Sequence, residues 1–258
     1  GLIDCPIHSL MGAEGNPGLV QDRMTAAQLA VRGMEFMRAT LEGGITAVRD
    51  CGGKDYIEFA MRDAFNAGRF LGPTMRCAGR LICMTGGHGN RNGRIADGVD
   101  DVVRAVREQI HAGSDLVKIM ATGGVMTPGV NPEDAHYSFA EINAGIAEAT
   151  RFHKTTASHA QGTEGILNAV RGGVTSIEHG IFMTDEAIGE MRTRGTWLVP
   201  TLAALVHILR GADAGDASIP PYVIEKSRRM AERHVESIKM YYEAGCKIAM
   251  GTDAGTPY

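Results

Sequence analysis

Short apolar runs alternate with longer amphipathic segments along this chain, and this alternation limits the possible folds more than any other feature. The apolar runs predict strands over residues 2–7, 46–49, 74–78, 115–120, 155–158, 174–177, 197–199 and 248–250. The segments between them predict helices over residues 25–41, 56–67, 99–112, 139–152, 163–171, 185–194 and 223–243, with a loop over 200–222. Strict alternation of strand and helix favours parallel strands joined by helical crossovers.

Two α/β architectures fit this alternation: a closed (β/α)8 TIM barrel and an open doubly wound sheet. The chain has 258 residues, and a barrel of this kind needs about 250. The glycine fingerprint GxGxxG and the Walker A loop, which mark nucleotide-binding open sheets, are both missing from the sequence. We therefore expect a single barrel domain over residues 1–258. No helix follows the last expected strand, so the predicted barrel is truncated after strand 8.

Composition excludes several classes of partner. The formal net charge is −4 and no run of Lys or Arg occurs, so nucleic acid is not an expected partner. No apolar stretch approaches the ~20 residues of a membrane span, so no membrane association is expected. The five cysteines are odd in number and scattered, which favours reduced thiols and a cytoplasmic protein.

Histidines and an aspartate close several of the apolar runs. His159 and His179 end strands in consecutive strand–helix units, and His8 and Asp253 follow the first and last strands. The carboxyl ends of barrel strands meet at one mouth, where the active sites of such barrels lie. Neutral imidazole is a common zinc ligand. A single histidine at a strand end is usually structural, but two in consecutive units favour metal binding.

Lys118 lies inside the apolar strand DLVKIM, where an unpaired ammonium is costly to bury. A desolvated lysine that reacts with CO₂ becomes a carbamate, an anion whose two oxygens can bridge two metal ions. An ion-paired or snorkelling lysine is the alternative. Asp253, in the turn GTDAG, is predicted to bind metal and to accept a proton from water, or else to be an ordinary turn residue.

Three loop residues are candidates for contact with the substrate. His88 lies in the glycine-rich sequence TGGHG after the third strand, and Tyr137 lies in the loop after the fourth. Both are predicted to be catalytic and substrate-binding residues, which would orient the substrate or stabilise an oxyanion, but an ordinary structural role in the loop fits each of them at least as well. Thr201, just after the seventh strand, is a weaker candidate for substrate binding. Four further histidines fall on expected helices or at their ends and are expected to be surface or packing residues: His111, His153, His207 and His234.

A set of motifs in a fixed order links the chain to a known family. These motifs are GLIDCPIHS, TGGHG, DLVKIMATGGV, HYSFAEINAGIAEA, ASHAQGTEGILNAVRGGVTSIEHG, LVPT and GTDAG. In this respect the sequence resembles the amidohydrolase superfamily, and within it the imidazolonepropionase-like group that includes Xaa-Pro (prolidase-like) and Xaa-Arg dipeptidase-like enzymes. The resemblance implies a metal-dependent hydrolase barrel with one or two divalent ions, zinc by preference. The family's flanking β-sandwich has no counterpart in this sequence.

The resemblance also implies a ligand set. His8, Asp253 and the carbamate of Lys118 would hold the more buried ion, and Lys118, His159 and His179 would hold the other. The family has the pattern HxH at the end of the first strand, whereas this chain reads Pro6-Ile7-His8. The second site is complete, but the first has lost one ligand, because proline has no side-chain donor.

From this resemblance we expect an enzyme that hydrolyses the amide or peptide bond of a small molecule, of the dipeptide or N-acyl amino acid type. Metal-activated hydroxide would attack the carbonyl, and Asp253 would move the proton to the leaving amine. Two alternatives remain. Pro6 is compatible with a degenerate barrel that binds metal without turnover, and an organophosphate or lactone hydrolase uses the same binuclear chemistry. A homo-oligomer is equally compatible with the sequence.

Overall fold

The predicted strands are confirmed, with one exception, in the computed structural model, which describes residues 1–256. They are β1 (Leu2–Ile7), β2 (Ile45–Asp50), β3 (Thr74–Cys77), β6 (Leu116–Met120), β7 (Thr155–Ala160), β8 (Ser176–His179) and β9 (Trp197–Val199). The exception is 248–250, which forms only an isolated bridge between Ile248 and Leu198. That prediction of a strand is wrong, because the chain pairs with β9 at one residue and then leaves to meet β1.

The seven predicted helices are confirmed. They are α2 (Ala26–Glu42), α3 (Ile57–Asn66), α4 (Val99–Ala112), α5 (Phe139–Arg151), α6 (Thr163–Arg171), α7 (Asp185–Arg194) and α9 (Pro221–Glu243). Two of them begin at a reciprocal capping box, formed by Thr25 with Gln28 in α2 and by Ser138 with Glu141 in α5. Such boxes satisfy backbone N–H groups that the first helical turn leaves free.

Four short elements were not predicted. They are α1 (Pro17–Asp22), β4 (Ile82–Cys83), β5 (Arg94–Ile95) and α8 (Leu202–Asp213). The prediction of a loop over 200–222 is therefore wrong for its first half, where Leu205 and Ile208 of α8 are buried. The two-residue strands β4 and β5 are too short to give a periodic pattern in the sequence.

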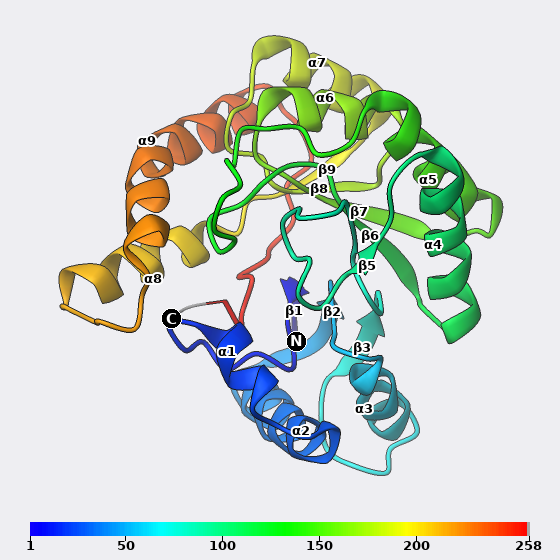
Figure 1. Cartoon of the computed structure of the whole chain (residues 1–258), viewed down its shortest axis with the longest axis vertical. Helices are drawn as coiled ribbons and strands as arrows, with labels where there is room; N and C mark the ends of the chain where they lie inside the picture. The colour runs from blue at the N-terminus through cyan, green and yellow to red at the C-terminus, as the bar shows by residue number, and fades with distance from the viewer. Residues whose placement is uncertain (257–258) are drawn as a thin grey trace.

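All strand pairs are parallel, in a sheet of order β1-β2-β3 and a sheet of order β5-β4-β6-β7-β8-β9. Backbone hydrogen bonds join the two sheets at both ends. The amide of Asp115, just before β6, donates to Cys77 of β3 at 2.9 Å. On the other side, Ala249 donates to Leu198 of β9 at 2.9 Å and Cys5 of β1 donates to Met250 at 3.3 Å. Figure 1 shows the helices arranged around the outside of these strands. The fold is thus α/β with parallel sheets, as expected of an amidohydrolase-type barrel.

Strand β6 shows how the sheets divide core from site. Val117 and Ile119 are buried in the main hydrophobic cluster, with side chains from α4, α5 and α6. Lys118 and Met120 alternate with them and line a pocket on the other side of the sheet. Successive side chains of a strand point to opposite faces, so Lys118 points toward the pocket although the other residues of β6 are apolar.

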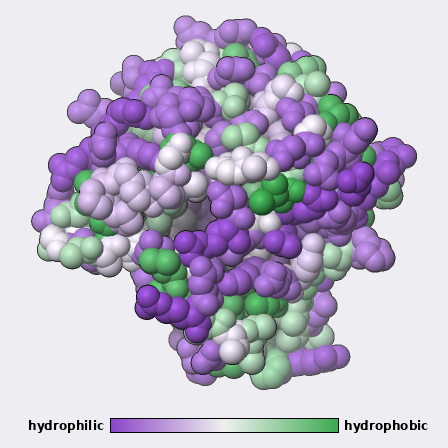
Figure 2. Space-filling model, viewed as in Figure 1, coloured by the Kyte–Doolittle hydropathy of each residue, from purple (hydrophilic) through white to green (hydrophobic). Residues whose placement is uncertain are grey.

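In the described part of the chain, no helix combines the length and the apolar character needed to cross a lipid bilayer. The face shown in Figure 2 is largely hydrophilic, and hydrophobic side chains appear on it only in small groups.

Candidate active site

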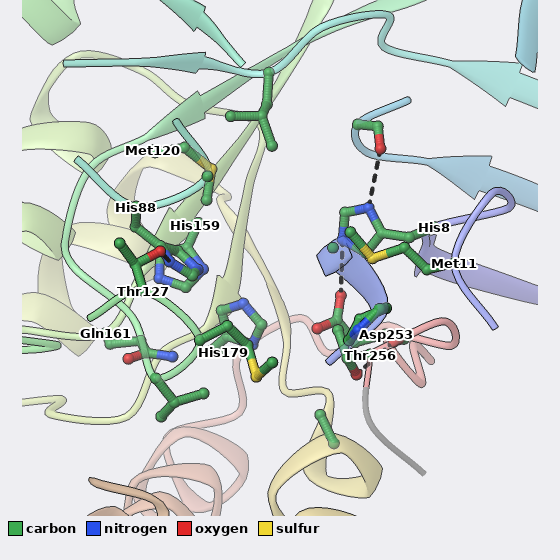
Figure 3. A pocket seen from close by; sticks show the side chains of 18 of the residues that line it. His8, Met11, His88, Met120, Thr127, His159, Gln161, His179, Asp253 and Thr256 are labelled. Carbon is green, nitrogen blue, oxygen red and sulfur yellow. Dashed lines mark hydrogen bonds and ion pairs between the residues drawn. The ribbon is translucent and has the colours of Figure 1, made fainter. Parts of the chain in front are cut away.

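The pocket has a volume of about 470 Å³ and is lined by residues from widely separated parts of the chain. Seven predicted site residues lie in it: His8, His88, Lys118, His159, His179, Thr201 and Asp253. In Figure 3 the labelled residues form two walls that face each other across the pocket. One, the histidine wall, consists of His88, His159 and His179. The other, the His8–Asp253 wall, consists of those two residues.

The histidine wall is a chain of neighbouring imidazole rings. The ring centroids of His88 and His159 are 4.5 Å apart, and those of His159 and His179 are 4.6 Å apart. His159 lies in β7 and His179 ends the neighbouring strand β8, so adjacent parallel strands bring the two rings together. This confirms the expectation that histidines of consecutive strand–helix units share one mouth.

Each of these rings commits one nitrogen to a protein oxygen. His159 Nε2 donates to the Gly123 carbonyl at 2.8 Å, which leaves Nδ1 free. His179 Nδ1 lies 2.6 Å from the Thr201 hydroxyl. That hydroxyl donates to the Pro200 carbonyl at 2.7 Å, so it accepts from Nδ1 and leaves Nε2 of His179 free. Histidines that bind metals typically anchor their second nitrogen in this way.

Burial keeps the histidine wall uncharged. It lowers the pKa of His88 to about 3 and that of His179 to about 4, and it lowers the pKa of His159 well below its usual range. The charge of Lys118 adds to the lowering in all three. Near neutral pH these rings therefore present lone pairs, the form in which imidazole binds a metal ion.

The His8–Asp253 wall joins the two ends of the described chain. His8 Nε2 lies 3.5 Å from Asp253 Oδ1, and His8 Nδ1 donates to the Gly52 carbonyl at 3.2 Å. Burial disfavours the charged form of both groups, but their mutual attraction outweighs it. The result is a raised pKa for His8 and a pKa of about 2 for Asp253. Asp253 is thus an ionised carboxylate near neutral pH.

Backbone and side-chain contacts with β1 fix the position of Asp253. Its amide donates to the Pro6 carbonyl at 3.0 Å. The carboxylate of Asp4 accepts from the amide of Thr252 at 2.8 Å and from its hydroxyl at 2.6 Å. Although Pro6 offers no side-chain donor, its carbonyl therefore still helps to hold the aspartate.

Lys118 is 4% exposed and lines the pocket. Within residues 1–256 its ammonium forms no hydrogen bond or ion pair. Its charge nonetheless affects residues of both walls. It contributes, after burial, His8 and His179, to the pKa of Asp253, which it lowers. It also lowers the pKa of His159. An ammonium buried without a counter-ion among residues 1–256 is costly, so a group that neutralises its charge would stabilise this position.

Three pocket residues have left-handed backbone conformations that side chains other than glycine rarely adopt. The φ angles are +77° at His179, +50° at Thr201 and +60° at Asp253. Side chains alternate between the two faces of β8, and Glu178 lies on the same face as Arg49, with which it forms an ion pair. As the next residue, His179 would therefore be expected on the opposite face. The left-handed turn at His179 re-aims the ring into the pocket. Strain of this kind concentrates at functional sites.

The structure separates Tyr137 from the other predicted site residues. Tyr137 is 1% exposed, belongs to the main hydrophobic cluster and donates its hydroxyl to the Ala96 carbonyl at 2.8 Å. It does not line the pocket. The catalytic and substrate-binding roles expected for Tyr137 therefore have no support in this geometry, because its hydroxyl is already used behind the sheet.

Sequence reasoning missed several residues that hold the site. Thr127 Oγ1 lies 2.9 Å from His88 Nδ1, and His234 of α9, predicted to be a surface or packing residue, donates Nε2 to the His179 carbonyl at 3.1 Å. His234 is 1% exposed and also lines the pocket. No spacing signal marks these residues, since they act from a loop and from the middle of a helix.

The two walls of the pocket differ in how many donors they offer to a divalent ion. Within residues 1–256, no three His, Cys, Asp or Glu side chains form a ready-made metal site. The histidine wall nevertheless offers free imidazole nitrogens, and Lys118 is positioned to act on both walls. A carbamate at Lys118 would supply the missing oxygens. On the opposite wall, where Pro6 has no side-chain donor, the described residues offer His8 and Asp253.

Comparison with known proteins identifies the family of this chain. Residues 1–257 match the model of the amidohydrolase family. Ochratoxinase of Aspergillus niger is 30% identical over 281 aligned residues, which cover 98% of this chain and 57% of ochratoxinase. The chain thus spans little more than half the length of this curated relative.

Solved structures give the same picture. A Xaa-Pro dipeptidase with methionine bound in its active site superposes with a TM-score of 0.91 at 30% identity, covering 100% of this chain and 66% of that one. A prolidase complexed with N-methylphosphonate-L-proline gives a TM-score of 0.89 at 32% identity, covering 98% and 65% of the two chains.

Proposed function

Since this chain belongs to the amidohydrolase family, we propose that it hydrolyses the amide or peptide bond of a small substrate, of the dipeptide or N-acyl amino acid type. One observation carries the proposal: a single pocket collects the neutral histidines of β7 and β8, the ionised Asp253, and Lys118, which has no partner among residues 1–256. Relatives named for a dipeptidase, a prolidase and ochratoxinase support an amide or peptide substrate.

We further propose that Lys118, as a carbamate, and His159 and His179 hold a zinc ion, with a weaker second position at His8 and Asp253. When bound, the ion supplies Lewis acidity toward the scissile carbonyl and lowers the pKa of a water molecule. His159 and His179 are prepared for this role because Gly123 and Thr201 fix the tautomer of each ring.

Asp253 is proposed to take the proton from the attacking water and to return it to the leaving amine. Asp253 is ionised across the neutral range, so its carboxylate oxygens are free of a proton and can take one up. His88, uncharged at its pKa of about 3, would hydrogen-bond the substrate carbonyl. We also propose that residues 247–254, which lie between β9 and β1, take the eighth position of a closed (β/α)8 barrel.

The test is metal content together with a substrate panel. We expect the purified protein, grown with zinc, to carry about one ion per chain. It should hydrolyse Xaa-Pro dipeptides or N-acyl amino acids, lose activity with a chelator and regain it with zinc. A preference for phosphotriesters or lactones would replace the proposed substrate class.

A second candidate is a degenerate barrel that binds metal without turnover, and Pro6 is the observation that favours it. Bound zinc without hydrolysis of any substrate in the panel would establish this candidate. Turnover by the unaltered sequence would eliminate it.

A further inference from the structure

Side chains of helix α9 contact a loop that holds two rings of the histidine wall. The loop, called here the 123–131 loop, is part of the connection between β6 and α5. Lys226, in the second turn of α9, directs its ammonium into this loop. Its Nζ donates to the carbonyls of Val130 at 2.6 Å, Thr127 at 2.9 Å and Gly124 at 3.4 Å. One side chain thus gathers three carbonyls that lie within seven residues of each other.

The match between ammonium and loop is complete. A lysine ammonium has three donors and no acceptor, and each donor meets one carbonyl. No carboxylate of residues 1–256 forms an ion pair with Lys226. The ring of Tyr222, one helical turn earlier, lies 5.3 Å from the Nζ. Lys226 therefore acts as a fixed cation around which the loop is folded, rather than as a solvated surface charge.

The same loop holds two rings of the histidine wall. Its Thr127 hydroxyl lies 2.9 Å from His88 Nδ1, and its Gly123 carbonyl accepts from His159 Nε2 at 2.8 Å. Gly124 packs so closely that a Cβ at this position would lie 2.4 Å from His88 Nε2. A shift of the loop would therefore change the orientation of both rings.

Two other side chains of α9 contact the loop, each at a single residue. The Tyr222 hydroxyl donates to the Met126 carbonyl at 3.2 Å, and Arg229 donates to the side chain of Asn131 at 2.6 Å. Arg229 is half exposed, so its contact is open to solvent. Among these three side chains, only Lys226 contacts both the start and the end of the loop.

We propose that Lys226 is a positioning residue for the active site: its ammonium, bound by three carbonyls of the 123–131 loop, holds Thr127 and Gly123 against His88 and His159. The inference rests on the proposed hydrolase function for its kinetic consequence. Its structural part, the order of the loop, is independent of that function.

The first test compares Lys226→Met with Lys239→Met. Methionine keeps much of the stem of Lys226 and removes the donors. Lys239 lies on the same helix, is 74% exposed and is 3.9 Å from Glu243. We expect Lys226→Met to lower kcat/KM by roughly 10- to 100-fold, mainly in kcat, as for other residues that orient metal-binding histidines. Amide hydrogen exchange of the 123–131 loop should accelerate, whereas Lys239→Met should change neither quantity.

A second variant, Lys226→Ala, separates positioning from general loss of folding. It leaves the carbonyls facing an empty volume that a small cation can enter. Methylammonium should slow the exchange of the loop again and restore part of kcat/KM, while a tetramethylammonium control, which has no N–H donor, should do neither. Absence of any rescue, with the protein folded, overturns the role of the ammonium.

The remaining outcomes are also decisive. Unchanged loop exchange in Lys226→Met overturns the structural part of the proposal. Faster exchange with an unchanged kcat/KM overturns the positioning role and leaves the hydrolase function intact. If the unaltered protein hydrolyses no substrate, the proposed function fails, and the exchange experiment still decides whether Lys226 orders the loop.

Discussion

The two walls of the pocket are built in different ways. In the histidine wall, His159 and His179 come from neighbouring strands with continuous parallel pairing, and each ring is anchored by a protein oxygen. The opposite wall depends on a contact between His8 and Asp253, 245 residues apart, and on isolated bridges rather than a regular strand pair. The first wall is thus fixed by regular strand pairing, whereas the second relies on the attraction between two side chains.

The largest expected effect tests the histidine wall. His159→Asn removes an imidazole from the proposed zinc position, so we expect kcat/KM to fall by roughly 10³-fold or more, because a metal ion contributes several kcal/mol to such reactions. Metal content should fall with it. His8→Asn should cost less, about tenfold, since its wall already lacks a ligand. Metal analysis and kinetics measure both.

The matched control for these two variants is His111→Asn, at an exposed position near the end of α4. It should leave kcat/KM and metal content unchanged. If His8→Asn cost more than His159→Asn, the proposed ranking of the two walls would be reversed.

Asp253→Asn tests whether the weaker wall carries the proton transfer. The amide keeps the size of the side chain but cannot accept a proton, so we expect kcat to fall by roughly 10²- to 10⁴-fold, the usual contribution of a general base. Metal should be retained, because the ligands of the complete site are untouched. An unchanged kcat would remove Asp253 from the mechanism.

Pro6→His tests why the walls differ. It restores the HxH pattern beside His8, and we expect metal content to rise from about one to about two ions per chain. Pro6→Ala is the control, since it removes the ring without adding a donor. Equal metal content in the two variants would mean that the second position is limited by something other than the missing ligand.

The strands and helices that build both walls were predictable because their apolar periodicity is local information. The convergence of His8, Lys118, His159, His179 and Asp253 was also predictable, since parallel strands end at one mouth. Tyr137 was misplaced because a residue in a loop has no period that fixes its direction. Thr127, Asp4 and His234 were missed because their roles depend on contacts that only the folded chain creates.

The smallest expected effect is on stability. It compares the residues packed behind the two walls, which include a buried carboxyl group in one case and are apolar in the other. Glu58 of α3 is 0% exposed, and neither carboxyl oxygen has a partner in residues 1–256. It packs against Gly53, next to the Gly52 carbonyl that holds His8. Burial, assisted by the charge of Asp50, raises the pKa of Glu58 to about 8 from 4.5. Behind the histidine wall, by contrast, the main cluster is apolar.

This raised pKa fixes the sign of a pH dependence. Between pH 4.5 and about 8 the folded protein holds a proton on Glu58 that the unfolded chain has lost. The free energy of unfolding therefore falls as pH rises through this window.

Glu58→Gln removes the titration, so relative to the unaltered protein it should gain stability from pH 5 to pH 8, by on the order of a few kcal/mol at most. Urea unfolding at both pH values, with exposed Glu42→Gln as the control, measures this difference. An equal pH slope in Glu58→Gln and the unaltered protein would show that burial of Glu58 does not destabilise the fold. The proposed difference in stability behind the two walls would then be wrong.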